Sequence, residues 1–134
     1  RVITQYLDEL AGSKLYPREK IYDILTLEAL ADGIMESAVS ITYESKLRPD
    51  NEQSPSWMEA QWSKVLHAIK ALDEGEFKAV DGEINMGQIA LACALGYLDF
   101  RHDARQWRIG HSNLASWNDK MMKLPALTKT IPTD

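Results

Sequence analysis

The chain has 134 residues, with 15 Lys and Arg against 20 Asp and Glu, which leaves a net charge of −5 when the histidines are neutral. A domain of this length buries roughly two-thirds of the surface that its unfolded chain exposes, so a core forms without disulfides or a structural metal. The hydrophobic fraction of 45% and the charged fraction of 26% argue against disorder. The acidic balance argues against nucleic acid as a partner, because that binding relies on clustered Lys and Arg.

The cysteine content and the apolar runs predict where the protein works. The single cysteine, Cys93, cannot form an internal disulfide, so we expect a reducing compartment and a cytoplasmic protein. No secretory cleavage pattern is visible near the start, where Asp8 and Glu9 interrupt the apolar residues. The most apolar run, 89–98, is about half of the roughly 20 residues that a membrane span needs. It predicts a buried helix, and no membrane partner is expected.

The first half of the chain predicts two helices. Apolar residues recur at helical spacing in residues 1–11, and Gly12 is placed to end this short helix. Its apolar stripe begins without a capping residue, which predicts that the chain is a piece of something longer. A long helix over 18–47 ends before Pro49, because a proline disfavours helical geometry in the residue before it.

The remaining elements are also helical in pattern. A third helix follows the polar loop 50–56, and its apolar residues lie on one side. The last helix, about 112–123, ends at Leu124-Pro125 and is followed by an extended tail. No segment alternates apolar and polar residues as a strand does, so the predicted fold class is all-α.

The clearest local signal is a capping box in front of a helix over about Met86 to Phe100. The Asn85 side chain is expected to accept from the backbone N–H of Gln88, while the Gln88 side chain reaches back to the N–H of Asn85. The helix is apolar nearly all round and rich in small residues, so its neighbours can approach closely. We therefore predict that it is the buried central helix of a bundle, with Cys93 packed in the core.

No complete active site is visible in the sequence. His67, His102 and His111 lie in different elements without paired ligands, so no metal site is expected. A Gly-rich phosphate loop, a nucleophile elbow and a paired-carboxylate motif are missing. Four aromatic residues of the second half are expected mainly in the core: Tyr97, Phe100, Trp107 and Trp117.

Two groups of charges have a structural and a functional interpretation. Glu28, Asp32 and Glu36 recur every four residues, which indicates either a solvated acidic face or a face directed across a cleft at a cationic group. The arginines of segment 101–108, with His102, either complement the end of the preceding helix or clasp an anion. The solvated face and the helix-end complement are the simpler interpretations.

These elements, in this order, resemble the C-terminal helical domain of glutathione transferases, particularly a bacterial branch. The matches are 28–34 in the long helix, 43–49 at its end, 89–101 in the central helix, and Trp107-Arg108. The likeness covers essentially the whole chain. The family's capping box usually has Ser or Thr followed by Asp, and Asn85 with Gln88 departs from that pattern.

The resemblance also implies a domain organisation. Residues 1–12 correspond to the last helix of the family's thioredoxin-like half, 13–17 to the linker, and 18–134 to the helical domain. The acidic-Ser pair that holds the γ-glutamyl end of glutathione in the family lies just before Arg1. The Ser, Cys or Tyr that activates the thiol belongs to the same half, so no catalytic residue is expected in this chain, which by itself should be inactive.

Matching the family position by position places Met35, Val39 and Tyr97 at the pocket for the hydrophobic co-substrate. Asp32 and Glu36 share the first helix's side of the glutathione cleft. A thioether, a branched aliphatic side chain and an amphipathic ring make an apolar pocket with a single polar handle. Ordinary packing in the bundle is the alternative for the first three residues.

The resemblance implies the co-substrate-binding domain of a glutathione transferase. The full-length protein would join glutathione to small hydrophobic electrophiles or reduce peroxides, and would be a two-fold homodimer with the long helix near the axis. A non-catalytic transferase-like module for protein interaction or ligand binding is the main alternative, because a fold does not guarantee its chemistry. A helical domain unrelated to transferases is a third interpretation.

Overall fold

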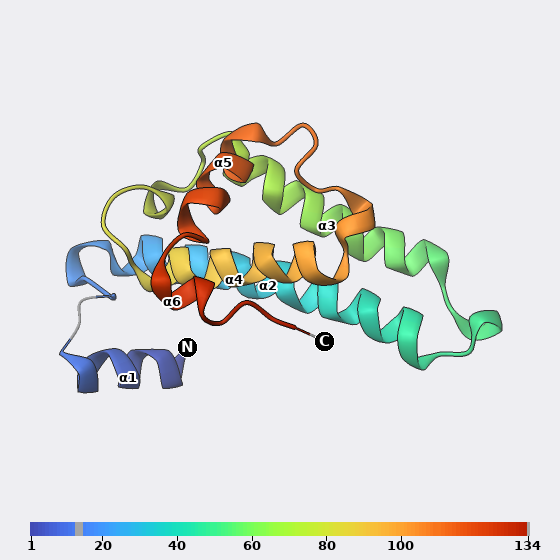
Figure 1. Cartoon of the computed structure of the whole chain (residues 1–134), viewed down its shortest axis with the longest axis horizontal. Helices are drawn as coiled ribbons and strands as arrows, with labels where there is room; N and C mark the ends of the chain where they lie inside the picture. Colours follow the sequence, from blue (N-terminus) through green and yellow to red (C-terminus); the bar gives the residue numbers. More distant parts are fainter. Residues whose placement is uncertain (13–14, 134) are drawn as a thin grey trace.

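The structure, a computed structural model, describes residues 1–12 and 15–133. Ser13 and Lys14 of the expected linker, and the terminal Asp134, lie outside the described residues. All regular elements in the described ranges are helices, which confirms the all-α prediction (Figure 1). In chain order they are α1 (Val2–Ala11), η1 (Arg18–Lys20), α2 (Ile21–Leu47), η2 (Asp50–Glu52), α3 (Pro55–Asp73), η3 (Lys78–Val80), α4 (Met86–Arg101), η4 (Asp103–Arg105), α5 (Ser112–Met121) and α6 (Pro125–Thr128).

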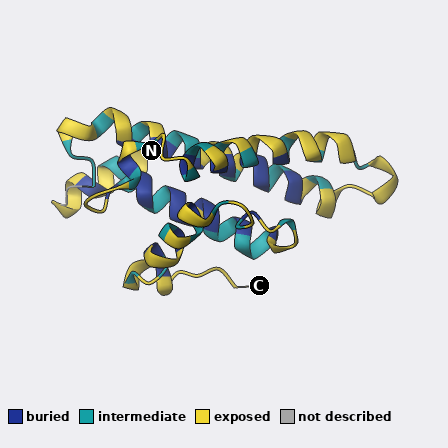
Figure 2. Ribbon diagram, turned by 90° about the horizontal axis from the view of Figure 1, so that it is seen from above, coloured by how far each residue is buried: buried dark blue, intermediate teal, exposed yellow. Residues whose placement is uncertain are grey.

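The core lies between α2 and α4, which pack against each other more extensively than any other pair of helices in the described part of the chain. Figure 2 shows the buried residues on the faces that the helices turn toward one another. Five aliphatic side chains here have no exposed surface, and each contributes about 1.5–3 kcal/mol on burial: Ile24, Leu27, Leu91, Leu95 and Leu98. The α3 helix packs on α2, and α5 packs on both α3 and α4, so that α4 is enclosed between α2 and α5, as predicted for the central helix.

The first turn of α4 lies unusually close to α2. A Cβ atom built on Gly87 would be 3.0 Å from the carbonyl oxygen of Ile24 and 3.0 Å from Cβ of Leu27. Real Cβ atoms rarely approach backbone this closely, so glycine is needed here for the contact rather than for its dihedral freedom. The small residue at position 87 therefore sets the separation of α2 and α4.

Local sequence signals determine where the helices begin and end. Gly12 is left-handed, with φ of 59°, and its N–H donates to the carbonyls of Asp8 and Glu9, which ends α1 as expected. Arg48 is extended in front of Pro49, and α2 stops at Leu47. The predicted start at residue 18 is a single 3₁₀ turn that leads into α2.

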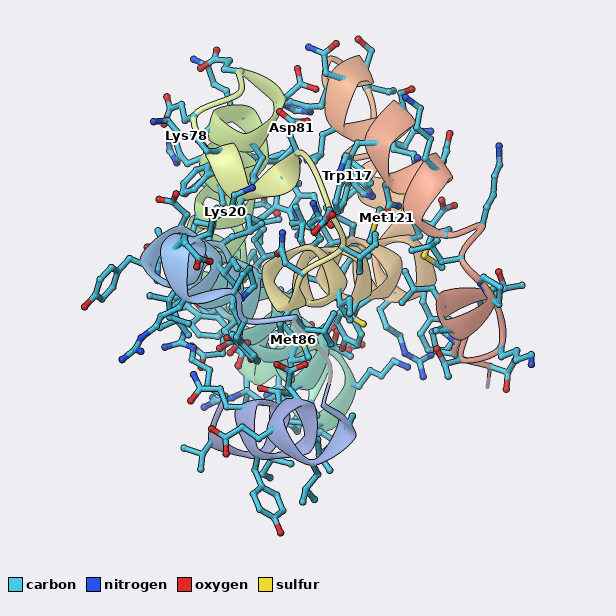
Figure 3. The ribbon with its side chains drawn as sticks, turned by 90° about the vertical axis from the view of Figure 1, so that its left-hand side faces the viewer. Lys20, Lys78, Asp81, Met86, Trp117 and Met121 are labelled. Carbon is cyan, nitrogen blue, oxygen red and sulfur yellow. The ribbon has the colours of Figure 1, made fainter. Side chains whose placement is uncertain are left out.

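The apolar stripe of α1 is turned away from the bundle. Val2, Ile3, Tyr6, Leu7 and Leu10 are between 55% and 82% exposed. Figure 3 shows α1 at the edge of the molecule, with side chains that project away from the other helices. A contiguous apolar surface of this kind marks an interaction site in most proteins.

The capping box is confirmed only in its first half. The Oδ1 atom of Asn85 accepts from the backbone N–H of Gln88 at 3.1 Å. The Gln88 side chain does not return to Asn85, because its Nε2 donates instead to the carbonyl of Val80 at 3.0 Å. The Asn85 amide donates to the carbonyl of Ala79 at 3.0 Å, so both side chains hold η3 against the start of α4.

Two other expectations are wrong. Cys93 is exposed, because α4 is covered by α2 on one side and by α5 on another while the Cys93 position faces a cleft. The segment after Pro125 is not wholly extended, since residues 125–128 form the helical turn α6 before the chain continues to residue 133. Leu127 of this turn is buried against Ala92 and Met121, which explains why the turn folds back on the bundle.

Candidate functional site

A cleft of about 230 Å³ lies between α2, α4 and the C-terminal segment. The α2 wall is Met35, and the α4 wall is formed by residues 92, 93, 96 and 97, which are one helical turn apart in pairs. Met122, Leu127 and residues 130–132 close the remaining side, where the chain runs back along the bundle after α6 (Figure 1). The lining is mainly apolar, which is typical of sites for small organic ligands.

The structure brings together two of the three predicted co-substrate residues. Met35 and Tyr97 both line the cleft, from α2 and α4 respectively. Val39 is half-buried one turn further along α2 and is not among the lining residues. Asp32 and Glu36 are exposed on α2 and do not line the cleft either.

The Tyr97 hydroxyl belongs to a buried polar network. It donates to Oγ1 of Thr42 at 3.1 Å. The Nε2 atom of His102 lies 3.1 Å from the same Thr42 oxygen and 2.9 Å from the carbonyl of Ala38. Tyr97 thus contributes its ring to the cleft wall, while its hydroxyl, expected as the polar handle of the pocket, is hydrogen-bonded to Thr42.

Burial controls the protonation of His102. Desolvation lowers its pKa below the usual value near 6.5, and the charge of Arg105 acts in the same direction. The Trp62 and Tyr97 rings flank the imidazole, with ring centroids 5.9 Å and 6.1 Å away. Thr42 was not singled out from the sequence, and His102 was considered as a site residue only as part of an anion clasp, because only the packing of α2 on α4 reveals that the two residues meet across 60 residues of sequence.

Cys93 adds a thiol to the cleft wall. Its apolar surroundings desolvate it and raise its pKa above the ordinary thiol value. A raised pKa keeps the sulfur protonated at neutral pH, so the thiol acts as a weak donor and a poor nucleophile there. This arrangement gives Cys93 no feature of an activated catalytic cysteine.

The acidic series on α2 separates into a buried and an exposed part. Glu28 is buried, and its Oε1 accepts from the Tyr16 hydroxyl at 2.9 Å and from the Thr4 hydroxyl at 3.3 Å. Burial, assisted by the neighbouring Glu28 carboxylate, raises the pKa of Tyr16 to about 12. The solvated-face interpretation is therefore wrong for Glu28, which instead holds α1 against α2, and it fits only Asp32 and Glu36.

The basic segment after α4 is engaged in ion pairs. Arg105 pairs with Glu59 at 2.8 Å, and Arg108 pairs with Asp99 at 2.8 Å and with Asp119 at 3.0 Å. The Arg108 head therefore joins the end of α4 to α5. Because Arg105 and Arg108 already have carboxylate partners, the structure does not support an anion clasp at these two residues and assigns them a structural role.

Two other clefts border the loop after α3. The larger, about 350 Å³, has the acidic residues Asp73, Glu74 and Asp81 in its lining. The second, about 310 Å³, lies between this loop and α5, where Figure 3 shows Trp117 and Met121 near Asp81. Neither cleft is lined by any of the predicted site residues. Trp117, a predicted core residue, lines both clefts.

Within residues 1–12 and 15–133, no three His, Cys, Asp or Glu side chains come together as metal ligands. No helix in the same ranges combines the length and the apolarity that a bilayer crossing requires.

Comparisons with known proteins agree with the fold. The family model for "Glutathione S-transferase, C-terminal domain" matches residues 55–119. A glutathione transferase family member from Pseudomonas fluorescens Pf-5, solved with bound S-(propanoic acid)-glutathione, is 37% identical with a TM-score of 0.95. The match covers 100% of this chain and 70% of that one.

Two further relatives extend this agreement. The glutathione S-transferase of Methylobacillus flagellatus KT, solved with glutathione bound, is 31% identical with a TM-score of 0.89, over 98% of this chain and 67% of that one. The uncharacterized GST-like protein YibF of Escherichia coli K12 is 29% identical over 98% of this chain and 67% of its own length. This chain therefore belongs to the glutathione transferase family and contains the family's C-terminal helical domain.

Proposed function

We propose that this domain supplies the binding site for the hydrophobic co-substrate of a glutathione transferase, and that the cleft beside Met35 and Tyr97 is that site. The observation that carries the proposal is the mainly apolar cleft of about 230 Å³ between α2, α4 and the C-terminal segment. Its volume and lining suit a small apolar electrophile or peroxide rather than a charged metabolite. In the full-length protein the reaction would be glutathione conjugation or peroxide reduction, helped by proximity in a closed site and by a lowered thiol pKa.

Glutathione would be held mainly by a thioredoxin-like half, with Asp32 and Glu36 facing it from α2. Asp32 lies beside the start of α1, since the Arg1 guanidinium contacts its carboxylate at 3.1 Å. The resemblance puts the acidic-Ser pair for the γ-glutamyl end immediately ahead of Arg1. An exposed carboxylate at this point can attract the ammonium group of that end of glutathione.

We also propose that α1 belongs to the thioredoxin-like half and that its exposed stripe packs there. Five apolar side chains on one face, all more than half exposed, support this assignment. The glutathione-activating residue would lie in the same half. The 134-residue chain is then expected to show a helical circular dichroism spectrum and no glutathione conjugation, whereas measurable conjugation by the purified chain would contradict this division of labour.

The test of the cleft is Tyr97→Ala in the full-length protein. The Michaelis constant for a hydrophobic electrophile such as 1-chloro-2,4-dinitrobenzene should rise, while that for glutathione stays nearly unchanged. Tyr22→Ala is the matched control, because Tyr22 lies on α2 and is 82% exposed. Equal losses for both substrates that track lost stability would show that Tyr97 is structural and that the cleft is elsewhere.

The full-length protein would be a cytoplasmic homodimer with α2 near the two-fold axis. Exposed apolar side chains at the junction of α2 and α3, namely Tyr43, Leu47 and Trp57, supply contact surface on that side. Light scattering over a concentration series checks the assembly. A tightly held trimer or tetramer would contradict it.

A further inference from the structure

We propose that Thr42 and His102 are positioning residues that hold the Tyr97 ring in the cleft wall, so that Tyr97 recognises the ligand by apolar contact and donates no hydrogen bond to it. This inference rests on the proposed function for the identity of the ligand. It assigns two residues that neither line the cleft nor belong to the predicted site. It also restricts the part of the ligand that contacts the Tyr97 ring to neutral, apolar groups.

The direction of each hydrogen bond in the network follows from elementary chemistry. The carbonyl of Ala38 can only accept, so Nε2 of His102, 2.9 Å away, must carry a proton and donate to it. The Thr42 hydroxyl also donates to the Ala38 carbonyl, at 3.1 Å. Its oxygen is then left to accept from the Tyr97 hydroxyl at 3.1 Å and to share the one Nε2 proton of His102, also at 3.1 Å, with the Ala38 carbonyl.

This accounting uses every hydrogen-bonding position of Thr42. A threonine hydroxyl has one proton and two lone pairs, and they go to Ala38, His102 and Tyr97. The Tyr97 proton therefore points into the protein rather than into the cleft. If the Tyr97 hydroxyl donated into the cleft instead, a buried lone pair of Thr42 would lose its donor. An unpaired buried acceptor is costly where the dielectric is low.

The network also joins the two walls of the cleft. Met35, Ala38 and Thr42 follow one another at helical spacing on α2, so the network lies within about 11 Å of Met35 along the helix. Tyr97 is on α4, and His102 is the C-cap residue of the same helix. Because the imidazole is held between the Trp62 and Tyr97 rings, the end of α4 cannot rotate without breaking this packing.

The experiment compares Thr42→Val, Tyr97→Phe and the double variant in the full-length protein. Each single variant should raise the Michaelis constant for 1-chloro-2,4-dinitrobenzene about three- to tenfold, the equivalent of one neutral hydrogen bond. The double variant should be no worse than the worse single variant, because both remove the same interaction. The constant for glutathione and kcat should stay nearly unchanged.

Two controls separate positioning from general damage. Thr42→Ser keeps the hydroxyl and should restore the wild-type constant. Thr26→Val removes a hydroxyl from the same helix that donates to the Tyr22 carbonyl at 2.7 Å outside the network, and it should have no effect. Additive losses in the double variant, a loss confined to Tyr97→Phe, or a fall in kcat would overturn the inference, because the hydroxyl would then act on the substrate.

The inference can be decided even if the proposed reaction is wrong. A wild-type protein without conjugating activity would contradict the proposed function. The same variants of the 134-residue chain would then be compared by the dissociation constant for the neutral fluorescent probe N-phenyl-1-naphthylamine, and circular dichroism would confirm that each is folded. The same non-additive pattern supports positioning by Thr42, and unchanged constants in all variants overturn it.

Discussion

Replacing Asn85 tests how the start of the central helix is held. Asn85→Ala removes two buried interactions at once: the cap on the N–H of Gln88 at 3.1 Å and the bond to the Ala79 carbonyl at 3.0 Å. Loss of an N-cap costs about 1 kcal/mol, and a lost neutral hydrogen bond costs about 1 kcal/mol more. The third contact, to the Glu83 carbonyl at 3.4 Å, is too long to add much. We expect the free energy of unfolding to fall by about 2–3 kcal/mol, including the cost of the orphaned carbonyl.

Asn85→Ser separates the two contributions. Serine keeps a capping oxygen but cannot reach the Ala79 carbonyl, so about 1 kcal/mol should be lost. Asn113→Ala is the control, since this exposed side chain makes one bond of 3.2 Å to the Asp73 carbonyl and should cost less than about 0.5 kcal/mol.

Urea unfolding, followed by circular dichroism, measures all three variants at constant m-value. Equal midpoints for Asn85→Ala and Asn113→Ala would refute the reasoning, because the buried bonds would then contribute nothing. A loss in Asn85→Ser as large as in Asn85→Ala would assign the effect to η3 rather than to the cap.

Further predictions concern packing and pH. Gly87→Ala should destabilise the protein by about 1–3 kcal/mol through its clash with α2, whereas Gly96→Ala, which meets no atom within 4 Å, should stabilise it slightly in thermal unfolding. Iodoacetamide should alkylate Cys93 slowly at pH 7. The rate should rise only at a higher pH than for an unperturbed thiol, because burial raises the pKa of Cys93. Burial lowers the pKa of His102 from 6.5 in the folded protein, so the imidazole takes up its proton at a higher pH in the unfolded chain than in the folded one. The free energy of unfolding should therefore fall as the pH drops below 6.5. Urea midpoints should show a flatter dependence over this range in His102→Gln, and identical slopes would contradict the assignment.

Local chemistry was sufficient to predict the helices from α1 to α5, although not the short turn α6. Proline at position 49, glycine at position 12 and asparagine at position 85 act within a few residues of themselves, and α2, α1 and α4 end or begin where those residues require. The apolar pattern also identified α4 as the central helix. The family resemblance placed Met35 and Tyr97 near one site, and both line the same cleft.

Tertiary packing decided what the pattern of residues left ambiguous. The repeat of Glu28, Asp32 and Glu36 is uniform in sequence, yet only Glu28 lies beneath α1 and is buried there by Tyr16 and Thr4. Cys93 belongs to an apolar run that reads as buried all round, but its direction on α4 meets a cleft instead of a helix.

The polar network shows the same division between local and long-range information. Tyr97 is recognisable from its place on α4, whereas the direction of its hydroxyl depends on Thr42, 55 residues earlier in the chain. Helix ends are set by hydrogen bonds within one or two turns, so they can be read from neighbouring residues. The orientation of a side chain in a cleft depends on which helix packs beside it, and that information is not local to any segment of the sequence.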